Sequence, residues 1–268
     1  MFQMNPTIER IKALRANRKL GQNFMVNEAI ADSEAEYASG RSVVELGPGL
    51  GVLTGRLCAK AKSVLAVERD ERLYNILSEE LRFGNLTLIN GNFFKQPDSV
   101  FKGCDIMVSN IPYNLSSKTI SWLSKHRMEA LLCVQEEFAE HMLAKPDTKK
   151  YSKLSVATSL MFNAYQMMRV PRNNFYPVPN VDSMLVYLKP KAEEINPETM
   201  RIVSLIMEHK KKSLKNAIID SQKQLGITKE EAAAIAGDLS LSSDKVFKLT
   251  PEQIAKTAKE LSYLIKGP

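Results

Sequence analysis

The chain has 268 residues, 44% hydrophobic and 25% charged, which is enough to bury a substantial core and to form two domains. Its three cysteines and three histidines show no disulfide or metal-ligand spacing, and no apolar run reaches the length of a membrane span or signal peptide. We therefore expect a cytoplasmic protein without a metal or a membrane contact, and the net charge of +7 favours an anionic partner.

The N-terminal segment is basic and is predicted to be helical over residues 5–16. Residues 1–20 hold five basic side chains against one acidic side chain, and Lys19 is a candidate RNA contact. Asn27 is placed to cap a second helix that runs to Ala38.

Three glycines at alternate positions follow the first predicted strand, residues 42–46. Gly47, Gly49 and Gly51 allow a tight turn, and Gly47 and Gly49 let the backbone approach a ligand at the start of the next helix. The pattern is weak evidence by itself, because many nucleotide-binding folds and some ordinary turns contain it.

The next predicted strand, residues 63–67, ends at Glu68, about twenty residues after the glycines. An acidic side chain at that position accepts hydrogen bonds from the ribose hydroxyls of an adenosine cofactor. A dinucleotide would satisfy the same geometry.

Further strands are predicted at residues 85–90, 104–109 and 130–134, and helical stretches separate them. Such alternation predicts an α/β fold with a parallel, Rossmann-like sheet. Residues 160–170 and 184–189 are expected to form a terminal antiparallel pair.

Asn110-Ile111-Pro112-Tyr113 follows the fourth of these strands, where an open α/β sheet binds its ligands. An exocyclic amine on a flat ring is a poor nucleophile, because its lone pair is delocalised into the ring. The Asn110 amide oxygen and the Ile111 carbonyl can each accept one N–H and free that lone pair. Pro112 stiffens the turn, and Tyr113 offers a stacking surface.

The alternative is an ordinary turn in which Asn110 and Pro112 have only backbone roles. Together with Pro48 inside the glycine turn, the tetrapeptide favours S-adenosylmethionine over a dinucleotide, because this cofactor carries no pyrophosphate.

Residues 189–197 are polar and contain two prolines, so the domain boundary is placed there. Residues 1–190 are expected to form a catalytic domain that binds the cofactor and carries the basic arm. Residues 191–268 are expected to form a smaller all-helical domain that binds RNA. Its candidate phosphate contacts are Lys210, Lys211, Lys212 and Lys215. The alternative for these lysines is a solvated helix face.

Several motifs in order resemble the small-subunit ribosomal RNA adenine dimethyltransferases, relatives of the macrolide-resistance methyltransferases and of mitochondrial transcription factors. The resemblance extends from Lys19 to about Leu249. Its motifs, besides the glycine turn and the tetrapeptide, are Arg18-Lys19-Leu20-Gly21-Gln22-Asn23-Phe24-Met25, Gln135-Glu136-Glu137-Phe138-Ala139, Tyr151-Ser152-Lys153-Leu154-Ser155-Val156 and Phe175-Tyr176-Pro177-Val178-Pro179-Asn180-Val181-Asp182-Ser183. His209-Lys210-Lys211-Lys212-Ser213 and Lys245-Val246-Phe247-Lys248-Leu249 look more like the archaeal branch.

The resemblance implies a class I methyltransferase sheet and a role for each matching residue. Asn23 and the Met25 backbone would close over S-adenosylmethionine, Gly47 would meet its methionine part, and Glu68 would hold its ribose. The remaining implied site residues are Asn92 at the cofactor's adenine amine, Asn110 at both cofactor and target, and Tyr113 and Phe175 on either face of the flipped base. Asn92 departs from the family pattern, which usually has Asp at this position.

The implied function is dimethylation of two adjacent adenosines near the 3′ end of small-subunit ribosomal RNA, by a monomer acting on a pre-small-subunit particle. One alternative is a methyltransferase of large-subunit RNA. The other is a non-enzymatic ribosome-assembly or transcription factor on the same fold.

Overall fold

The computed structural model describes residues 21–266. The helix predicted at residues 5–16 and the candidate contact Lys19 lie outside that range.

The chain divides into two compact units. The first comprises the chain up to Ala139 together with Tyr165–Pro190, and the second comprises Glu140–Ala164 together with the chain from Lys191. The chain passes from the first unit into the second after Pro190, within the predicted boundary at residues 189–197. The segment 140–164, however, groups with the C-terminal helices and not with the sheet. The binding roles expected of the two domains stay predictions.

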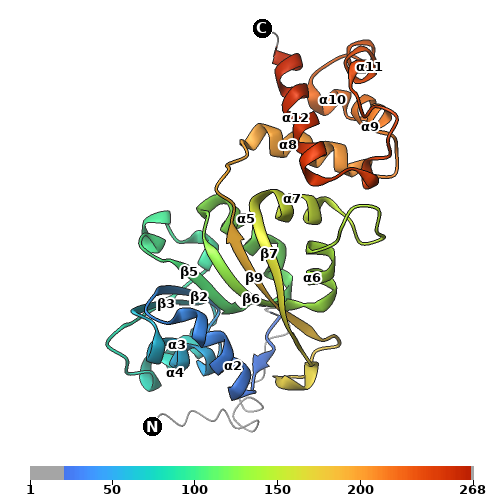
Figure 1. Ribbon diagram of the computed structural model, residues 1–268. Coiled ribbons are helices and arrows are strands. Elements are labelled where there is room, and N and C mark those ends of the chain that lie inside the picture. The colour runs from blue at the N-terminus through green and yellow to red at the C-terminus, as the bar shows by residue number, and fades with distance from the viewer. Residues whose placement is uncertain (1–20, 267–268) are drawn as a thin grey trace. The chain divides into compact units, whose positions relative to one another are not determined.

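The first unit contains a seven-stranded sheet with the strand order β4-β3-β2-β5-β6-β9-β7 (Figure 1). Strands β2 to β6 are parallel to one another, whereas β9 is antiparallel to its neighbour β6. The strands are β2 Ser42–Leu46, β3 Ser63–Glu68, β4 Leu86–Asn90, β5 Ile106–Asn110, β6 Glu129–Gln135, β7 Phe162–Val170 and β9 Ser183–Pro190. The predicted α/β class, with a mostly parallel sheet and an antiparallel end, is confirmed.

The central strands are apolar because both faces of the sheet are covered. Ile106, Met107 and Val108 of β5 are fully buried, as is nearly all of 130–134 in β6. Near-continuous apolar runs are typical of parallel strands that are covered on both faces.

Helices and short 3-10 segments connect the strands. In the first unit they are α2 Glu28–Ala35, η2 Glu36–Ala38, α3 Val52–Lys60, α4 Glu71–Glu80, η3 Phe93–Lys95, η4 Asp98–Phe101, η5 Tyr113–Leu115, α5 Ser116–His126 and η6 Arg172–Asn174, with α6 Glu136–Met142 continuing into the second unit. Asn27 caps α2 as predicted, since its amide oxygen accepts from the Ile30 N–H at 3.3 Å. The α-helix itself ends at Ala35, and a 3-10 turn completes the predicted span to Ala38.

A separate two-stranded ribbon joins distant parts of the chain. Strand β1 (Phe24–Met25) pairs antiparallel with β8 (Phe175–Tyr176), so that Met25 lies opposite Phe175. The ribbon brings the N-terminal motif and the Phe175 motif together.

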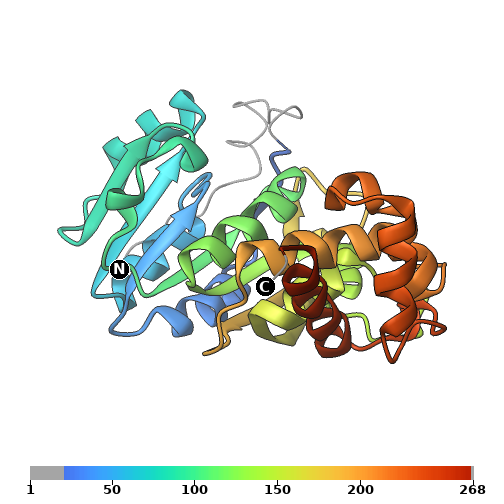
Figure 2. The ribbon, with the colours of Figure 1, turned by 90° about the horizontal axis from the view of Figure 1, so that it is seen from above.

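The second unit is helical. Its elements are α7 Lys153–Met161, α8 Pro197–Glu208, α9 Leu214–Asp220, α10 Gln222–Leu225, α11 Lys229–Asp238, η7 Val246–Lys248 and α12 Pro251–Lys266. Figure 2 shows α8 to α12, coloured orange to dark red, gathered around one another, and α8 packs against both α9 and α12. None of the helices described here is long and apolar enough to cross a membrane.

The strand predicted from Leu160 begins only at Phe162. Leu160 and Met161 are the last residues of α7, and Leu160 is buried in the helical core of the second unit. The apolar run is continuous across this point, and its pattern does not distinguish the end of a buried helix from the start of a strand.

Tyr151 is a central residue of the second unit's core. Its side chain is fully buried, and its hydroxyl donates to the Leu249 carbonyl at 2.9 Å. Its own carbonyl accepts a hydrogen bond from the Lys210 ammonium. Tyr151 therefore connects three segments that are distant in sequence.

Replacing Tyr151 by Phe should destabilise the protein by about 1–3 kcal/mol, because the buried Leu249 carbonyl loses its donor. Thermal unfolding followed by circular dichroism measures the change. Tyr263→Phe is the matched control, since Tyr263 is 68% exposed, and it should leave the midpoint unchanged. Equal midpoints for Tyr151→Phe and the wild type would contradict this assignment.

Candidate active site

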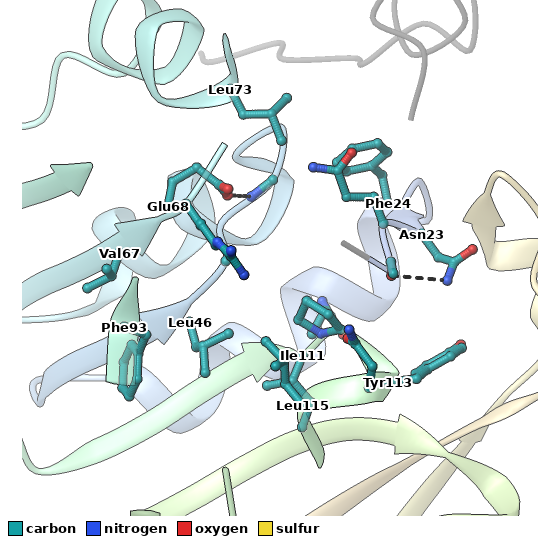
Figure 3. Close-up of a pocket in the computed structure, with 18 of the residues that line it drawn as sticks. Asn23, Phe24, Leu46, Val67, Glu68, Leu73, Phe93, Ile111, Tyr113 and Leu115 are labelled. Carbon is teal, nitrogen blue, oxygen red and sulfur yellow. Dashed lines mark hydrogen bonds between the residues drawn. The ribbon is translucent and has the colours of Figure 1, made fainter. Parts of the chain in front are cut away.

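A cavity lies at the carboxyl ends of the parallel strands of the first unit. Its volume is about 200 Å³, and every residue that lines it belongs to the first unit. Figure 3 shows side chains from β1, β2, β3 and the loop after β5 converging on it. The lining residues are Gly21, Gln22, Asn23, Phe24, Leu46, Gly47, Gly49, Val67, Glu68, Arg69, Leu73, Gly91, Asn92, Phe93, Phe94, Asn110, Ile111, Pro112, Tyr113, Asn114, Leu115, Lys118, Cys133 and Phe175.

The glycine turn after β2 forms one wall. Gly47, Gly49 and Gly51 have φ angles of 71°, 62° and 78°, in the left-handed region that favours glycine. A Cβ atom on Gly49 would lie 3.0 Å from the Phe24 ring, and one on Gly51 would lie 2.7 Å from a Leu77 methyl group. Glycine is therefore required at 49 and 51 by backbone conformation and by packing together.

Glu68 lies at the end of β3, as the sequence predicts, with its side chain beside the glycine turn (Figure 3). It is 5% exposed, and its two oxygens accept from the Gly49 N–H at 3.1 Å and the Asp70 N–H at 2.7 Å. Burial raises its pKa, while these backbone donors favour the carboxylate. A third backbone donor, the Arg69 N–H, also favours the carboxylate, and the two oxygens together keep acceptor capacity for a ligand hydroxyl.

Asn92 follows β4 and lines the cavity. Its amide oxygen accepts from the Phe94 N–H at 3.1 Å and so caps the short helix η3. The sequence motif did not reveal this capping role. The oxygen retains one lone pair for a cofactor, so its expected contact with an adenine amine stays a prediction.

Asn110 is the last residue of β5, and only the nitrogen of its side-chain amide is hydrogen-bonded among the described residues. Its Nδ2 donates to Glu34 Oε2 at 2.9 Å, while its Oδ1 is buried and has no hydrogen-bond partner among the described residues. A buried acceptor without a donor is costly, and such atoms mark functional positions. The tetrapeptide therefore contains one unsatisfied buried oxygen, on a residue that lines the cavity.

The rest of the tetrapeptide forms a rigid turn. Ile111 is 2% exposed, and the Pro112 carbonyl accepts from the Leu115 N–H at 2.8 Å. The Tyr113 hydroxyl is 2.7 Å from Ser183 Oγ, and burial raises its pKa to about 12. Tyr113 is therefore neutral at pH 7 and suits stacking better than proton transfer.

The ribbon completes the site. Asn23, Phe24 and Phe175 line the main cavity, whereas Met25 lines a smaller adjoining cavity of about 40 Å³. The Asn23 amide donates to the Gly21 carbonyl at 3.4 Å (Figure 3).

The sequence analysis missed many of the lining residues, and Phe24, Lys118 and the supporting residue Glu34 are examples whose contacts are clear. Phe24 stands inside a recognised motif, and only the contact with Gly49 reveals its role. Lys118 lies 4.4 Å from the centre of the Phe94 ring, at the cavity wall. Glu34 is a charged residue between Ala31, Ala35 and Ala38 on the buried face of α2, and that irregularity was the available signal.

The lysine cluster lies in the second unit, and its members differ. Lys210 donates to the Tyr151 carbonyl, and Lys212 pairs with Asp220 although it is exposed. Lys211 and Lys215 are exposed as well. The geometry therefore leaves Lys211 and Lys215 as the better candidates for phosphate contact. In the part of the chain that the structure describes, no group of three or more His, Cys, Asp or Glu side chains is arranged to hold a metal ion.

Two curated relatives of this chain come from archaea. A protein of Thermococcus gammatolerans named probable ribosomal RNA small subunit methyltransferase A is 38% identical over 246 residues, which is 90% of this chain and 87% of the relative. A protein of the same name from Methanopyrus kandleri is 38% identical over 259 residues, 91% of this chain and 92% of the relative.

Solved structures share the fold. A dimethyladenosine transferase from Plasmodium falciparum matches with a TM-score of 0.73 and 27% identity, covering 86% of this chain and 94% of that chain. The 23S rRNA methyltransferase ErmE matches with a TM-score of 0.60 and 25% identity, covering 90% and 100%.

The model of the family described as ribosomal RNA adenine dimethylase matches residues 13–262, nearly the whole chain. The glycine turn, Glu68, the Asn110 tetrapeptide and the Phe175 ribbon all lie within this range. The chain belongs to the ribosomal RNA adenine dimethylase family.

Proposed function

We propose that this protein transfers methyl groups from S-adenosylmethionine to the exocyclic amines of two adjacent adenosines near the 3′ end of small-subunit ribosomal RNA, giving dimethyladenosine. The observation that carries the proposal is the amide of Asn110, a cavity-lining residue, which is held by its nitrogen and whose buried oxygen has no hydrogen-bond partner among the described residues.

The residues around the cavity fit the cofactor. Gly47 and Gly49 would admit its methionine part, the Glu68 carboxylate would accept from its ribose, and Asn92 would accept from its adenine amine. Asn23 and the Met25 backbone would close over the cofactor on the side of the cavity that the β1–β8 ribbon borders. S-adenosylmethionine supplies the methyl group and a good leaving group in its sulfonium.

The target base would be held by the tetrapeptide and the ribbon. Asn110 Oδ1 and the Ile111 carbonyl would each accept one N–H of the target amine, which restores the lone pair to nitrogen. Tyr113 and Phe175 line the same cavity and would stack on the two faces of the flipped base. No strong base is needed, because the product ammonium loses its proton readily.

The relatives named for the small subunit support that RNA as the substrate, at 38% identity over about nine-tenths of the chain. The exposed Lys211 and Lys215 would contact its phosphates. We place the reaction on a pre-small-subunit particle, with a monomeric enzyme in the cytoplasm, where the three free cysteines would stay reduced.

The proposal is tested by incubating the protein and labelled S-adenosylmethionine with purified small ribosomal subunits and, separately, with purified large ribosomal subunits. The label should enter small-subunit RNA. Label in large-subunit RNA alone would favour the macrolide-resistance type of activity. No incorporation, with no heat of cofactor binding in a calorimetric titration, would favour a non-enzymatic factor.

Asn110→Ala should slow methyl transfer on the order of a hundredfold, the usual cost of one preorganised polar contact in the transition state. RNA affinity should stay the same, because phosphate contacts dominate it. Single-turnover rates and filter binding separate the two effects, and Asn75→Ala on the exposed face of α4 is the matched control. Near-normal turnover by purified Asn110→Ala would exclude the proposed role.

Asn92→Asp should tighten S-adenosylmethionine binding by roughly three- to tenfold, since an ionised acceptor makes the stronger hydrogen bond. An Asp oxygen can still cap η3, so the fold should be unaffected. Titration calorimetry compares the two proteins. Equal or weaker binding by the Asp variant would show that Asn92 is tuned to its surroundings or does not contact the adenine.

Lys211→Glu combined with Lys215→Glu should weaken RNA binding and flatten the log–log salt dependence by roughly 0.7–0.9 per lost phosphate contact. Lys210 is left in place, because its bond to Tyr151 belongs to the core. Lys223→Glu with Lys259→Glu makes the same charge change at other exposed positions of the second unit. If both pairs change the slope equally, the cluster is only a solvated face.

A further inference from the structure

Glu34 is a carboxyl group buried directly behind the proposed reaction centre. It is 1% exposed, on the face of α2 that packs against the sheet. Its Oε2 accepts from Asn110 Nδ2 at 2.9 Å, and its Oε1 is buried without a hydrogen-bond partner among the described residues. A buried carboxyl that makes one hydrogen bond is expensive to keep, and stability does not account for it.

The two ends of an asparagine amide are nearly identical in shape but opposite in hydrogen bonding. The oxygen only accepts, and the NH₂ group only donates. An ionised carboxylate also only accepts, so it can face only the NH₂ end. With Glu34 ionised, the Asn110 oxygen must point away from α2. An apolar side chain at position 34 would permit both orientations.

We propose that Glu34 is a positioning residue, which holds the Asn110 amide with its oxygen toward the amine of the target base. The inference rests on the proposed function, because only a target N–H requires an acceptor at this point. The flipped amide would present NH₂ to the target amine, and two donors would face each other.

The surroundings of Glu34 make its charge sensitive to pH. The titratable groups near it are acidic or neutral: Glu45 on β2, with Glu68 next to Glu45, and the Cys133 thiol on β6. On the neighbouring helix α3, Arg56 is already paired with Glu28 and Asp32, and Lys60 with Glu36. Burial raises the pKa of Glu34 to about 8, and the hydrogen bond from Asn110 opposes that rise.

The sign of the pH effect follows from these contacts. Above its pKa, Glu34 is a carboxylate and fixes one orientation of Asn110. Below it, the protonated carboxyl can donate to the Asn110 oxygen as well as accept from its nitrogen, so both orientations are allowed. Turnover should therefore rise with pH through the titration of Glu34.

The first test needs neither cofactor nor RNA. In the wild type, the side-chain ¹⁵N–¹H signals of Asn110, assigned by their loss in Asn110→Ala, should shift between about pH 7 and pH 9. Glu34→Gln should abolish the shift. Glu45→Gln is the matched control, because Glu45 is equally buried but bonded to Thr54, and it should keep the shift. Asn110 signals that do not change with pH in the wild type would overturn the proposal.

The second test is kinetic. Glu34→Leu should lower kcat on the order of tenfold, the scale of one hydrogen bond to a charged group, and leave the KM for RNA unchanged. The same change in an Asn110→Ala background should cost nothing further, since no amide remains to orient. Equal losses in both backgrounds would overturn the proposal.

The Glu34→Gln variant and the activity of the wild type supply two further comparisons. If Glu34→Leu does not fold, Glu34→Gln replaces it, because Gln has the same side-chain shape as Glu. The rate of Glu34→Gln should not rise between pH 7 and pH 9. A rise like that of the wild type would count against the proposal. If the wild type methylates no ribosomal RNA, the proposed function fails. The pH dependence of the Asn110 side-chain signals still decides whether Glu34 orients that amide.

Discussion

The parallel pairing of β2 with β5 is the constraint on which the site depends. From β2 the chain adds β3 and β4 on one side, and then returns to add β5 and β6 on the other. Side chains cannot cover the point where the direction of addition reverses, so a cavity opens at the carboxyl ends of these strands. Each motif stands at one such end: the glycine turn after β2, Glu68 at the end of β3, Asn92 after β4, and Asn110 at the end of β5.

The chemistry at this edge follows from which atoms are already satisfied. Both oxygens of Glu68 and the oxygen of Asn92 accept backbone N–H groups, so these side chains are held in place before any ligand binds. Asn110 is held by its nitrogen instead, and its oxygen is left without a donor. A preorganised acceptor costs no rearrangement when the reaction occurs, which is how polar groups lower barriers most effectively.

The strands and the strand-end residues could be predicted from the sequence, because apolar runs and glycine spacing are local signals. The partners of those residues could not. That Asn92 caps η3, that Lys210 binds the Tyr151 carbonyl and that Glu34 holds Asn110 are contacts between side chain and fold that no spacing encodes. The grouping of residues 140–164 with the C-terminal helices also depends on long-range packing, through Tyr151 and Leu249. A charged residue among the alanines of α2 was visible, but its purpose required the position of β5.

We propose that the Asn110 oxygen accepts from the exocyclic amine of adenine during methyl transfer. Nucleoside mass spectrometry of small-subunit RNA, digested after incubation with the protein and S-adenosylmethionine, tests it most directly. We expect dimethyladenosine methylated on the exocyclic nitrogen, at two adjacent positions near the 3′ end. Methylation of a ring nitrogen or of a ribose would contradict it, because neither target presents an N–H pair to that oxygen and the neighbouring carbonyl.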